Sequence, residues 1–158
     1  MNILIRQMKT DEYPLLNVFL YEAIFVPEGA QPPPKDIILA PELQVYIADF
    51  GKQKDDLCFV AEADGRVAGA VWVRDMQDYG HIEDGVPSFA IALYKGYRGQ
   101  GIGTTLMTRM LDELRSRGYP KASLSVQKAN RAVKLYLDTG FEILRETDEE
   151  YIMVCHLN

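Results

Sequence analysis

Apolar residues recur along the chain with two spacings, and these predict strands and helices in alternation. Residues 56–63 and 67–76 are rich in Val, Ala and Phe and flank Asp64-Gly65, a pair typical of a hairpin turn. Residues 88–94 (SFAIALY) form a continuous apolar run, as expected for a strand covered on both faces. Shorter runs predict strands at 2–7, 121–127, 141–146 and 151–157.

Spacings of three and four residues predict the helices. The clearest one extends to about Arg117, with Gly118 as its stop. Its apolar stripe comprises Ile102, Leu106, Met110, Leu111 and Leu114. Three shorter helices are expected, within residues 10–25, 40–51 and 130–140. Thr10 or Asp11 is the candidate N-cap of the first of these helices, and Gly51 is the candidate stop of the second. Asn130 is the candidate N-cap of the third.

Residues 26–37 contain four prolines and a glycine, and we expect a long loop over residues 26–41, because proline fixes φ and removes a backbone donor. Loops of this length are more often functional than idle. The element order is then β-α-α-β-β-β-α-β-α-β-β. This alternation predicts the α/β class, with a mixed sheet flanked by helices. At 158 residues the chain fits a single domain over residues 1–158.

Charge and cysteine content narrow the class of protein. A formal net charge of −6 argues against a nucleic-acid partner. Cys58 and Cys155 lie in apolar runs and favour buried thiols, with a disulfide or a catalytic thiol as alternatives. The N-terminus is too charged for a signal peptide, and no apolar run approaches the roughly 20 residues needed to cross a bilayer. We therefore expect a cytoplasmic protein without a membrane partner.

The segment YRGQGIGTT (97–105) indicates an anion-binding turn. It follows the buried strand 88–94 and opens the helix at 102, where the first N–H groups have no intrahelical partner. Glycines allow a phosphate to approach these amides, and Arg98 adds a charged donor. The hydroxyls of Thr104 and Thr105 lie within reach of the same place. On spacing alone, the alternative that the glycines only make a tight turn stays open.

Two better-known phosphate motifs do not fit this segment. GxxxxGK[ST] requires a lysine that is absent here, and the dinucleotide fingerprint GxGxxG belongs after an early strand. Two isolated histidines without carboxylates at ligand spacing predict no metal site.

Together, two stretches of the sequence resemble the GNAT superfamily of acetyl-CoA-dependent N-acetyltransferases. Arg98, Gly101 and Gly103 fill the fixed positions of that family's pyrophosphate loop, [RQ]xxGx[GA]. A second signature, an Asn, a small residue, a Tyr and then Gly-Phe, follows at the right separation. Its residues here are Asn130, Ala132, Tyr136, Gly140 and Phe141.

The resemblance implies a sheet splayed between its fourth and fifth strands, with acetyl-CoA as cosubstrate in the opening. The pyrophosphate would lie on the 98–104 loop, and pantetheine would run beside the fourth strand near Leu93, satisfying backbone groups that the splay leaves free. The residues expected to bind the cosubstrate are Leu93, Tyr94, Arg98, Gly99, Gln100, Gly101, Ile102, Gly103, Thr104, Thr105, Asn130, Ala132 and Tyr136.

Tyr136 matches the family tyrosine that reaches the CoA sulfur, so it is the candidate general acid for the leaving thiolate. A backbone N–H at Leu93 or Tyr94 would stabilise the oxyanion. The alternative for Tyr136 is an amphipathic core position. Asn130 has two compatible roles, as a helix cap and as a cosubstrate contact.

The general base is the weakest point of the resemblance. Many family members place a Glu at the start of the fourth strand, where this chain has Ser88. Glu83, with Asp84 and His81, lies just before it and is the candidate catalytic carboxylate, unless the amine is deprotonated by solvent. Glu22 and Glu28 are alternatives for binding a cationic substrate, and Trp72 is either hairpin core or pocket wall.

The expected partner is a small-molecule amine or a protein amine. Dimers are frequent among relatives, so a homodimer is compatible with the resemblance. The competing hypotheses are an acyl-CoA-binding module without catalysis and a nucleotide-binding protein that uses the same loop. The proline-rich 26–41 segment is expected to shape or cover the acceptor pocket.

Overall fold

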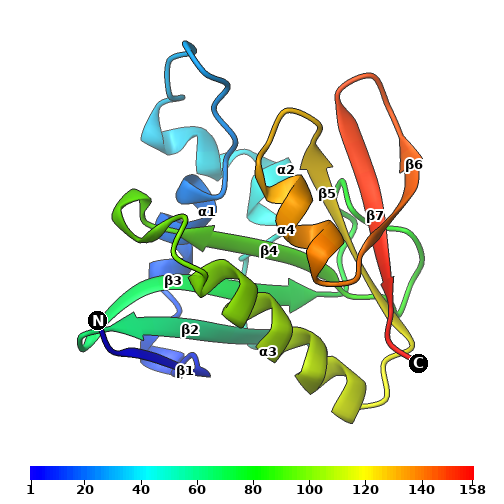
Figure 1. Cartoon of the computed structure of the whole chain (residues 1–158), viewed down its shortest axis with the longest axis horizontal. Coiled ribbons are helices and arrows are strands. Elements are labelled where there is room, and N and C mark those ends of the chain that lie inside the picture. Colours follow the sequence, from blue (N-terminus) through cyan, green and yellow to red (C-terminus); the bar gives the residue numbers. More distant parts are fainter.

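The computed structural model describes residues 1–158 and has one seven-stranded sheet in the order β1-β2-β3-β4-β5-β7-β6 (Figure 1). All neighbouring strands are antiparallel except β4 and β5, which are parallel. The strands are β1 (Ile3–Gln7), β2 (Leu57–Ala63), β3 (Arg66–Arg74), β4 (Ser88–Leu93), β5 (Lys121–Gln127), β6 (Glu142–Glu146) and β7 (Glu150–His156). The helices are α1 (Leu15–Glu22), α2 (Pro41–Gln44), α3 (Ile102–Ser116) and α4 (Ala132–Asp138). The predicted order of elements and the mixed-sheet class are confirmed.

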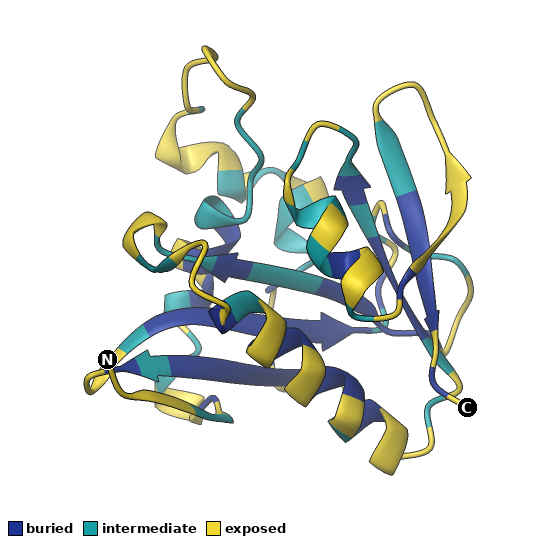
Figure 2. Ribbon diagram, viewed as in Figure 1, coloured by how far each residue is buried: buried dark blue, intermediate teal, exposed yellow.

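Helices cover both faces of the sheet. The buried stripe of α3 packs on one face, and its exposed side faces solvent (Figure 2). Leu16, Phe19 and Leu20 of α1 pack on the other face, with Trp72 of β3. The expected stop of α3 is confirmed, because Gly118 has φ +85° directly after the last turn.

The hairpin turn between β2 and β3 is also confirmed. Asp64 and Gly65 have φ values of +50° and +85°, as a two-residue turn with the twist of its strands requires. This tight connection holds β2 and β3 in antiparallel register from Leu57↔Val73 to Ala63↔Arg66.

The sheet opens between β4 and β5, as expected. These two strands pair only at Ser88↔Ser123, where the Ser123 amide donates to the Pro87 carbonyl at 3.0 Å. Beyond this vertex the strands diverge toward Leu93 and Gln127. The opening leaves one edge of β4 without a neighbouring strand.

The alternation of backbone directions identifies the groups at that open edge. The Tyr94 amide donates to the Ala68 carbonyl of the β3 side at 3.0 Å, whereas the Pro87 carbonyl faces β5. Because N–H and C=O groups of successive residues in a strand point to opposite sides, those of Ile91 and Leu93 face the opening. Arg98 Nε donates to the Leu93 carbonyl, so the groups available to an extended ligand are the Leu93 amide and both backbone groups of Ile91.

The N-terminal helices are shorter than the sequence predicts. A 3₁₀ turn at Thr10–Glu12 precedes α1, which begins after Pro14, so neither Thr10 nor Asp11 caps it. The helix α2 ends at Gln44, and residues 45–50 form irregular turns before Gly51. The helix does not continue because the Arg74 guanidinium donates hydrogen bonds to the Val45 and Ala48 carbonyls, at 3.1 and 2.9 Å.

Both cysteine thiols are free and buried. Burial raises the pKa of each thiol above its usual range, which keeps both groups protonated. The alternatives of a disulfide and of a reactive thiolate therefore do not apply to this structure. No helix combines the length and apolar character needed to span a bilayer.

Candidate active site

Two cavities meet at the opening between β4 and β5. The larger, of about 1050 Å³, extends to the start of α3 and to the 21–33 segment. The smaller, of about 420 Å³, lies beside α1 and the 43–46 turn. Their walls share Ala23, Ile24, Phe25, Ile91, Asn130 and Tyr136. The fold thus provides two compartments joined at the open edge of β4.

The glycine-rich loop forms one end of the larger cavity. Gly101 has φ +85° and directly precedes α3, and no atom lies within 4 Å of where its Cβ would be. The first i→i−4 bond of the helix runs from the Thr105 amide to the Gly101 carbonyl. The amides of residues 102–104 therefore have no helical partner and carry the positive end of the helix dipole. This cradle suits a phosphate group.

Only part of the predicted loop faces this cavity. The lining residues are Arg98, Gly99, Gly101, Gly103 and Thr104. Gln100 instead donates to the Gly96 carbonyl, and the Thr105 hydroxyl donates to the Gly101 carbonyl. Ile102 is a core side chain with 3 % exposure, and contributes only its backbone amide to the helix start.

Arg98 connects the loop to the open strand edge. Its Nε donates to the Leu93 carbonyl at 3.0 Å, and its Nη2 lies 3.2 Å from the Glu22 carbonyl. The Tyr94 amide is already bonded to Ala68, so of the two amides expected to face an oxyanion, only the one of Leu93 points into the opening.

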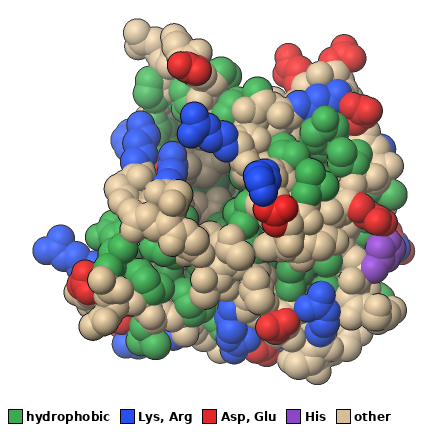
Figure 3. All heavy atoms as spheres, in the orientation of Figure 1, with side chains coloured by type: hydrophobic (Ala, Val, Ile, Leu, Met, Phe, Trp, Pro, Cys, Tyr) green, Lys and Arg blue, Asp and Glu red, His purple; other side chains and the backbone are tan.

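Basic side chains surround the larger cavity. Lys95, Arg98 and Arg131 are among its lining residues, and the hollow on this face is bordered by basic groups (Figure 3). In a chain of net charge −6, this is a local concentration of positive charge next to the glycine-rich turn. Sequence reasoning missed Arg131, although its position directly after the signature Asn130 was a signal.

The 26–41 segment forms a wall of the larger cavity instead of the smaller one. Its lining residues are Val26, Pro27, Glu28, Ala30, Pro32 and Pro33. The Tyr21 hydroxyl donates to the Pro33 carbonyl, which ties the segment to α1. The segment also contains a 3₁₀ helix, Lys35–Leu39, where only a loop was expected.

Tyr136 lies at the junction of the two cavities. It projects from α4, is 8 % exposed, and stacks edge-on against Phe141 with ring centroids 6.1 Å apart. Burial raises the pKa of the Tyr136 phenol to about 12, so the hydroxyl stays protonated at neutral pH. The ring packs in the core, and the residue also lines both cavities, so its role as general acid stays a prediction.

Asn130 and Ala132 begin the α4 wall. The Asn130 Oδ1 accepts a hydrogen bond from the Ala132 amide at 2.9 Å, which caps the first turn of the helix. Asn130 lines both cavities as well, whereas Ala132 lines only the larger. The cap thereby fixes the helix that carries Tyr136.

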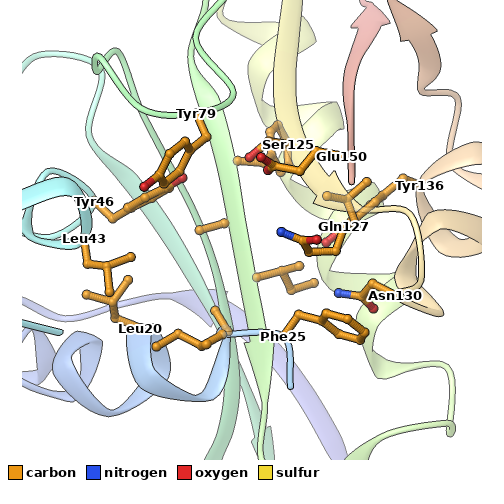
Figure 4. A pocket seen from close by; sticks show the side chains of 16 residues that line it. Leu20, Phe25, Leu43, Tyr46, Tyr79, Ser125, Gln127, Asn130, Tyr136 and Glu150 are labelled. Carbon is orange, nitrogen blue, oxygen red and sulfur yellow. The ribbon is translucent and has the colours of Figure 1, made fainter. Parts of the chain in front are cut away.

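The smaller cavity is mainly apolar and aromatic. Of its 16 lining residues, 12 are apolar or aromatic, and Glu150 is the one charged residue. Tyr46 and Tyr79 lie on one wall, opposite Gln127, Asn130 and Tyr136 (Figure 4). Sequence reasoning missed Tyr46, Tyr79, Ser125, Gln127 and Glu150, which no local motif marks.

The structure does not bring Glu83 to either cavity. Its carboxylate forms an ion pair with Lys121 and its side chain is 54 % exposed. His81 and Asp84 also lie outside the cavities, with His81 Nε2 3.3 Å from Asp84 Oδ1. The 76–87 loop therefore does not supply the base from the positions expected.

Three of these loop groups lie together, which the sequence spacing did not predict. Asp75, His81 and Asp84 each have one atom of a kind that can bind a metal, and these three atoms lie within 4.8 Å of one another. Asp75 accepts from the Gly85 amide, and Asp84 lies beside the His81 ring. Contacts of this kind are those of an ordinary loop, and we assign no ion to them.

The other residues considered for the substrate pocket do not line the smaller cavity. Glu22 and Glu28 line the larger cavity, not the smaller one. Trp72 is fully buried and donates from Nε1 to the Tyr46 carbonyl at 3.1 Å, so it is a core residue that supports the wall.

Comparison with known proteins identifies the family of the chain. Residues 20–141 match the model of the acetyltransferase (GNAT) family, and the chain belongs to that family. The match includes the glycine loop and the Asn130 to Phe141 signature.

Curated relatives match only part of their length. Mycothiol acetyltransferase of Streptomyces avermitilis is 34 % identical over 95 residues, 59 % of this chain and 29 % of that protein. An acetyltransferase of Pectobacterium atrosepticum is 35 % identical over 79 residues, 49 % of this chain and 51 % of that protein. The matched stretches thus span between about a third and a half of these relatives.

Solved structures share the whole fold. A GNAT-family acetyltransferase of Streptococcus pneumoniae superposes with a TM-score of 0.73 at 21 % identity, covering 99 % of this chain and 100 % of that one. The PaiA N-acetyltransferase of Thermoplasma acidophilum, solved in complex with coenzyme A, gives 0.72 at 19 % identity over 99 % of both chains.

Proposed function

We propose that this chain transfers the acetyl group of acetyl-CoA to a primary amine, by direct attack while both substrates are bound. The observation that carries the proposal is the position of Tyr136 in the wall of both cavities. One compartment has the groups that suit CoA, and the other has an apolar pocket of a size for a small amine.

Features of the larger cavity fit CoA. The unpaired amides at the start of α3 suit a pyrophosphate, and Lys95, Arg98 and Arg131 suit further phosphate oxygens. The free N–H and C=O groups of Ile91 suit an amide of pantetheine. When bound, acetyl-CoA supplies a thioester carbonyl that is open to attack by an amine.

In this proposal the chain's own groups act on both sides of that carbonyl. The Leu93 amide donates a hydrogen bond to the carbonyl oxygen as charge develops on it. Tyr136 donates its proton to the sulfur that leaves, and its pKa of about 12 keeps that proton available at neutral pH. Asn130 holds the start of α4 in place through its bond to the Ala132 amide.

The smaller cavity favours an amine with an aromatic or aliphatic body. Its walls are mostly apolar, and Glu150 is the single carboxylate that lines it. A protein of similar fold is described as a spermidine N-acetyltransferase and another as a ribosomal-protein-S18-alanine N-acetyltransferase. A polyamine carries several charges, which one carboxylate in an apolar wall does not compensate. We therefore propose a monoamine as acceptor, in the cytoplasm, where free cysteines persist.

The proposal is tested by measuring thiol release from acetyl-CoA with a panel of amines. Aromatic and aliphatic monoamines are expected to give turnover, and spermidine to give less. Binding of CoA by calorimetry, without thiol release for any amine, would support an acyl-CoA-binding module, a function that the serine at position 88 favours. Equal stabilisation by ATP and CoA would instead support a nucleotide-binding protein.

A further inference from the structure

The loop between β3 and β4 folds back over the vertex of the sheet opening. The Ser123 hydroxyl donates to the Gly80 carbonyl at 2.7 Å. A Cβ on Gly80 would lie 2.9 Å from backbone atoms of Leu124 and Ser125, so the loop rests directly on β5. This contact holds Asp78, two residues earlier, above the place where β4 and β5 separate.

Asp78 occupies a buried position beside the first residue of β4. Its Oδ1 accepts a hydrogen bond from the Ser88 hydroxyl at 2.7 Å. Its Oδ2 is buried and makes no hydrogen bond. Desolvation raises the pKa of the Asp78 carboxyl, against weaker opposing effects of the neighbouring Ser88 and Tyr46 hydroxyls and of the Gly80 amide. A carboxylate with an unsatisfied buried oxygen has capacity to accept a proton.

Tyr46 connects this carboxylate to the smaller cavity. Its hydroxyl lies near the Asp78 carboxyl and the Ser125 hydroxyl, and both groups influence its pKa. Tyr46 and Ser125 both line the smaller cavity (Figure 4), whereas Asp78 is not among its lining residues. The turn that carries Tyr46 is fixed by Trp72 Nε1, which donates to the Tyr46 carbonyl at 3.1 Å.

We propose that Asp78 is the terminal proton acceptor for the amine substrate and that Tyr46 relays the proton to it. This inference rests on the proposed acetyl transfer. A substrate ammonium bound in the smaller cavity gives one proton to the Tyr46 oxygen, while the Tyr46 hydroxyl gives its own proton to the Asp78 carboxylate. The products of this step are a neutral amine, an unchanged tyrosine and a protonated Asp78, so charge and protons balance.

The same arrangement explains why the first residue of β4 need not be a carboxylate. Ser88 holds a carboxylate supplied by the preceding loop, in place of carrying one itself. Glu83 is paired with Lys121 outside the cavities. Glu150 lines the smaller cavity from β7, opposite Gln127 in the register, and is the natural counter-charge for the arriving ammonium.

Other titratable groups face this region and enter any pH profile. Tyr79 acts on Tyr46 from the same loop as Asp78. The His81 amide donates to the Asp78 carbonyl, and Arg145 of β6 donates to the His81 carbonyl. Glu150 faces the cavity from β7. The experiment therefore compares single substitutions with the wild type under otherwise identical conditions.

The test is the pH dependence of kcat/KM for an alkyl monoamine between pH 5 and 10. With the wild type, the rate is expected to rise as Asp78 ionises and then to level off, because the enzyme removes the amine proton itself. With Asp78→Asn, only free amine reacts, so the rate is about 100-fold lower at pH 7 and rises tenfold per pH unit up to the amine pKa. A purely structural role would lower the rate at every pH by the same factor.

Two further variants keep the test independent of whether Asp78→Asn folds. Tyr46→Phe retains the carboxylate but removes the relay, and is expected to give the same steep profile. Ser88→Ala removes a hydrogen bond that stabilises the ionised carboxyl, and shifts the acid limb upward by roughly half to one pH unit. Asp84→Asn, at an exposed carboxylate of the same loop, is the matched control and keeps the wild-type profile.

A direct readout complements the kinetics. The ¹³Cγ resonance of Asp78, assigned by its loss in Asp78→Asn, is expected to titrate at the midpoint of the wild-type acid limb and to move with it in Ser88→Ala. A wild-type-shaped profile in both Asp78→Asn and Tyr46→Phe, or loss of the acid limb in Glu150→Gln or Glu83→Gln instead, overturns the inference while the transfer reaction stands. Absence of wild-type turnover with every amine overturns the proposed function and this inference with it.

Discussion

Arg74 and Asp56 form a two-point ion pair in the interior of the protein. The Nε–Oδ1 and Nη2–Oδ2 distances are both 2.9 Å, and the side chains are 2 % and 0 % exposed. The third nitrogen of the guanidinium donates to the Val45 and Ala48 carbonyls. One buried pair thus connects the end of β3 to the turn that carries Tyr46.

Replacing Asp56 with Asn is expected to lower the free energy of unfolding by about 3–5 kcal/mol, because it leaves the Arg74 charge buried without its counter-charge. Chemical denaturation measures this change. Asp49→Asn is the control, since Asp49 is 80 % exposed in a weak pair with Lys52 and Asn tolerates its φ of +53°. Equal stability of Asp56→Asn and wild type would contradict the role of the pair.

Gly101→Ala is expected to weaken CoA binding about tenfold. The new Cβ enters the open space in front of the first α3 amides, where we place the pyrophosphate. Gly118→Ala is a matched control, because Gly118 has the same φ of +85°, has no atom within 4 Å of its Cβ position and lies at the far end of α3. Both variants carry the same backbone strain. Calorimetry would oppose the assignment if the two bound CoA equally well.

Tyr136→Phe is expected to lower kcat about 100-fold while the Kd for acetyl-CoA changes less than twofold. The substitution removes a proton donor that acts in the transition state and retains the ring that packs on Phe141. Steady-state kinetics and calorimetry separate the two quantities. Tyr151→Phe, at a position that lines neither cavity, is the control. Wild-type turnover in Tyr136→Phe would remove this phenol from the mechanism.

The Arg6–Glu12 pair predicts a pH-dependent contribution to stability. Hydrogen bonds from Arg6, at 2.8 Å to each Glu12 oxygen, lower the pKa of the Glu12 carboxyl to about 2, from 4.5 in an unperturbed chain. A lowered pKa in the folded state means that the contribution is complete above pH 4.5 and is lost as pH falls toward 2.

Unfolding of wild type and Glu12→Gln is therefore expected to differ by about 1–2 kcal/mol at pH 6–7 and to converge near pH 2, after allowance for solvent screening. Urea titrations at a series of pH values measure the difference. A gap that stayed constant across this range would mean that packing, not ionisation, makes the contribution.

Local patterns in the sequence were sufficient to predict the order of elements and the glycine turn that precedes α3. The alternation in β2 and β3, the Asp64-Gly65 turn and the α3 stripe each depend on neighbours within a few residues. The glycine loop also depends on local order, because the unpaired amides belong to the first turn of the following helix. The extent of α2 could not be predicted, because Arg74, distant in sequence, takes the carbonyls of the following turn.

Residues distant in sequence meet only in the tertiary structure, and this decided the rest of the site. Tyr46, Asp78, Ser125 and Glu150 come from four segments with no shared motif, and the divergence of β4 from β5 brings them to one cavity and its wall. Glu83 stands closer to β4 in sequence than Asp78 does, yet pairs with Lys121 outside the cavities, while the contact of Gly80 with β5 holds Asp78 at the vertex. The physical reason is that a side chain's surroundings are set by the packing of strands and loops on one another, which local periodicity does not encode.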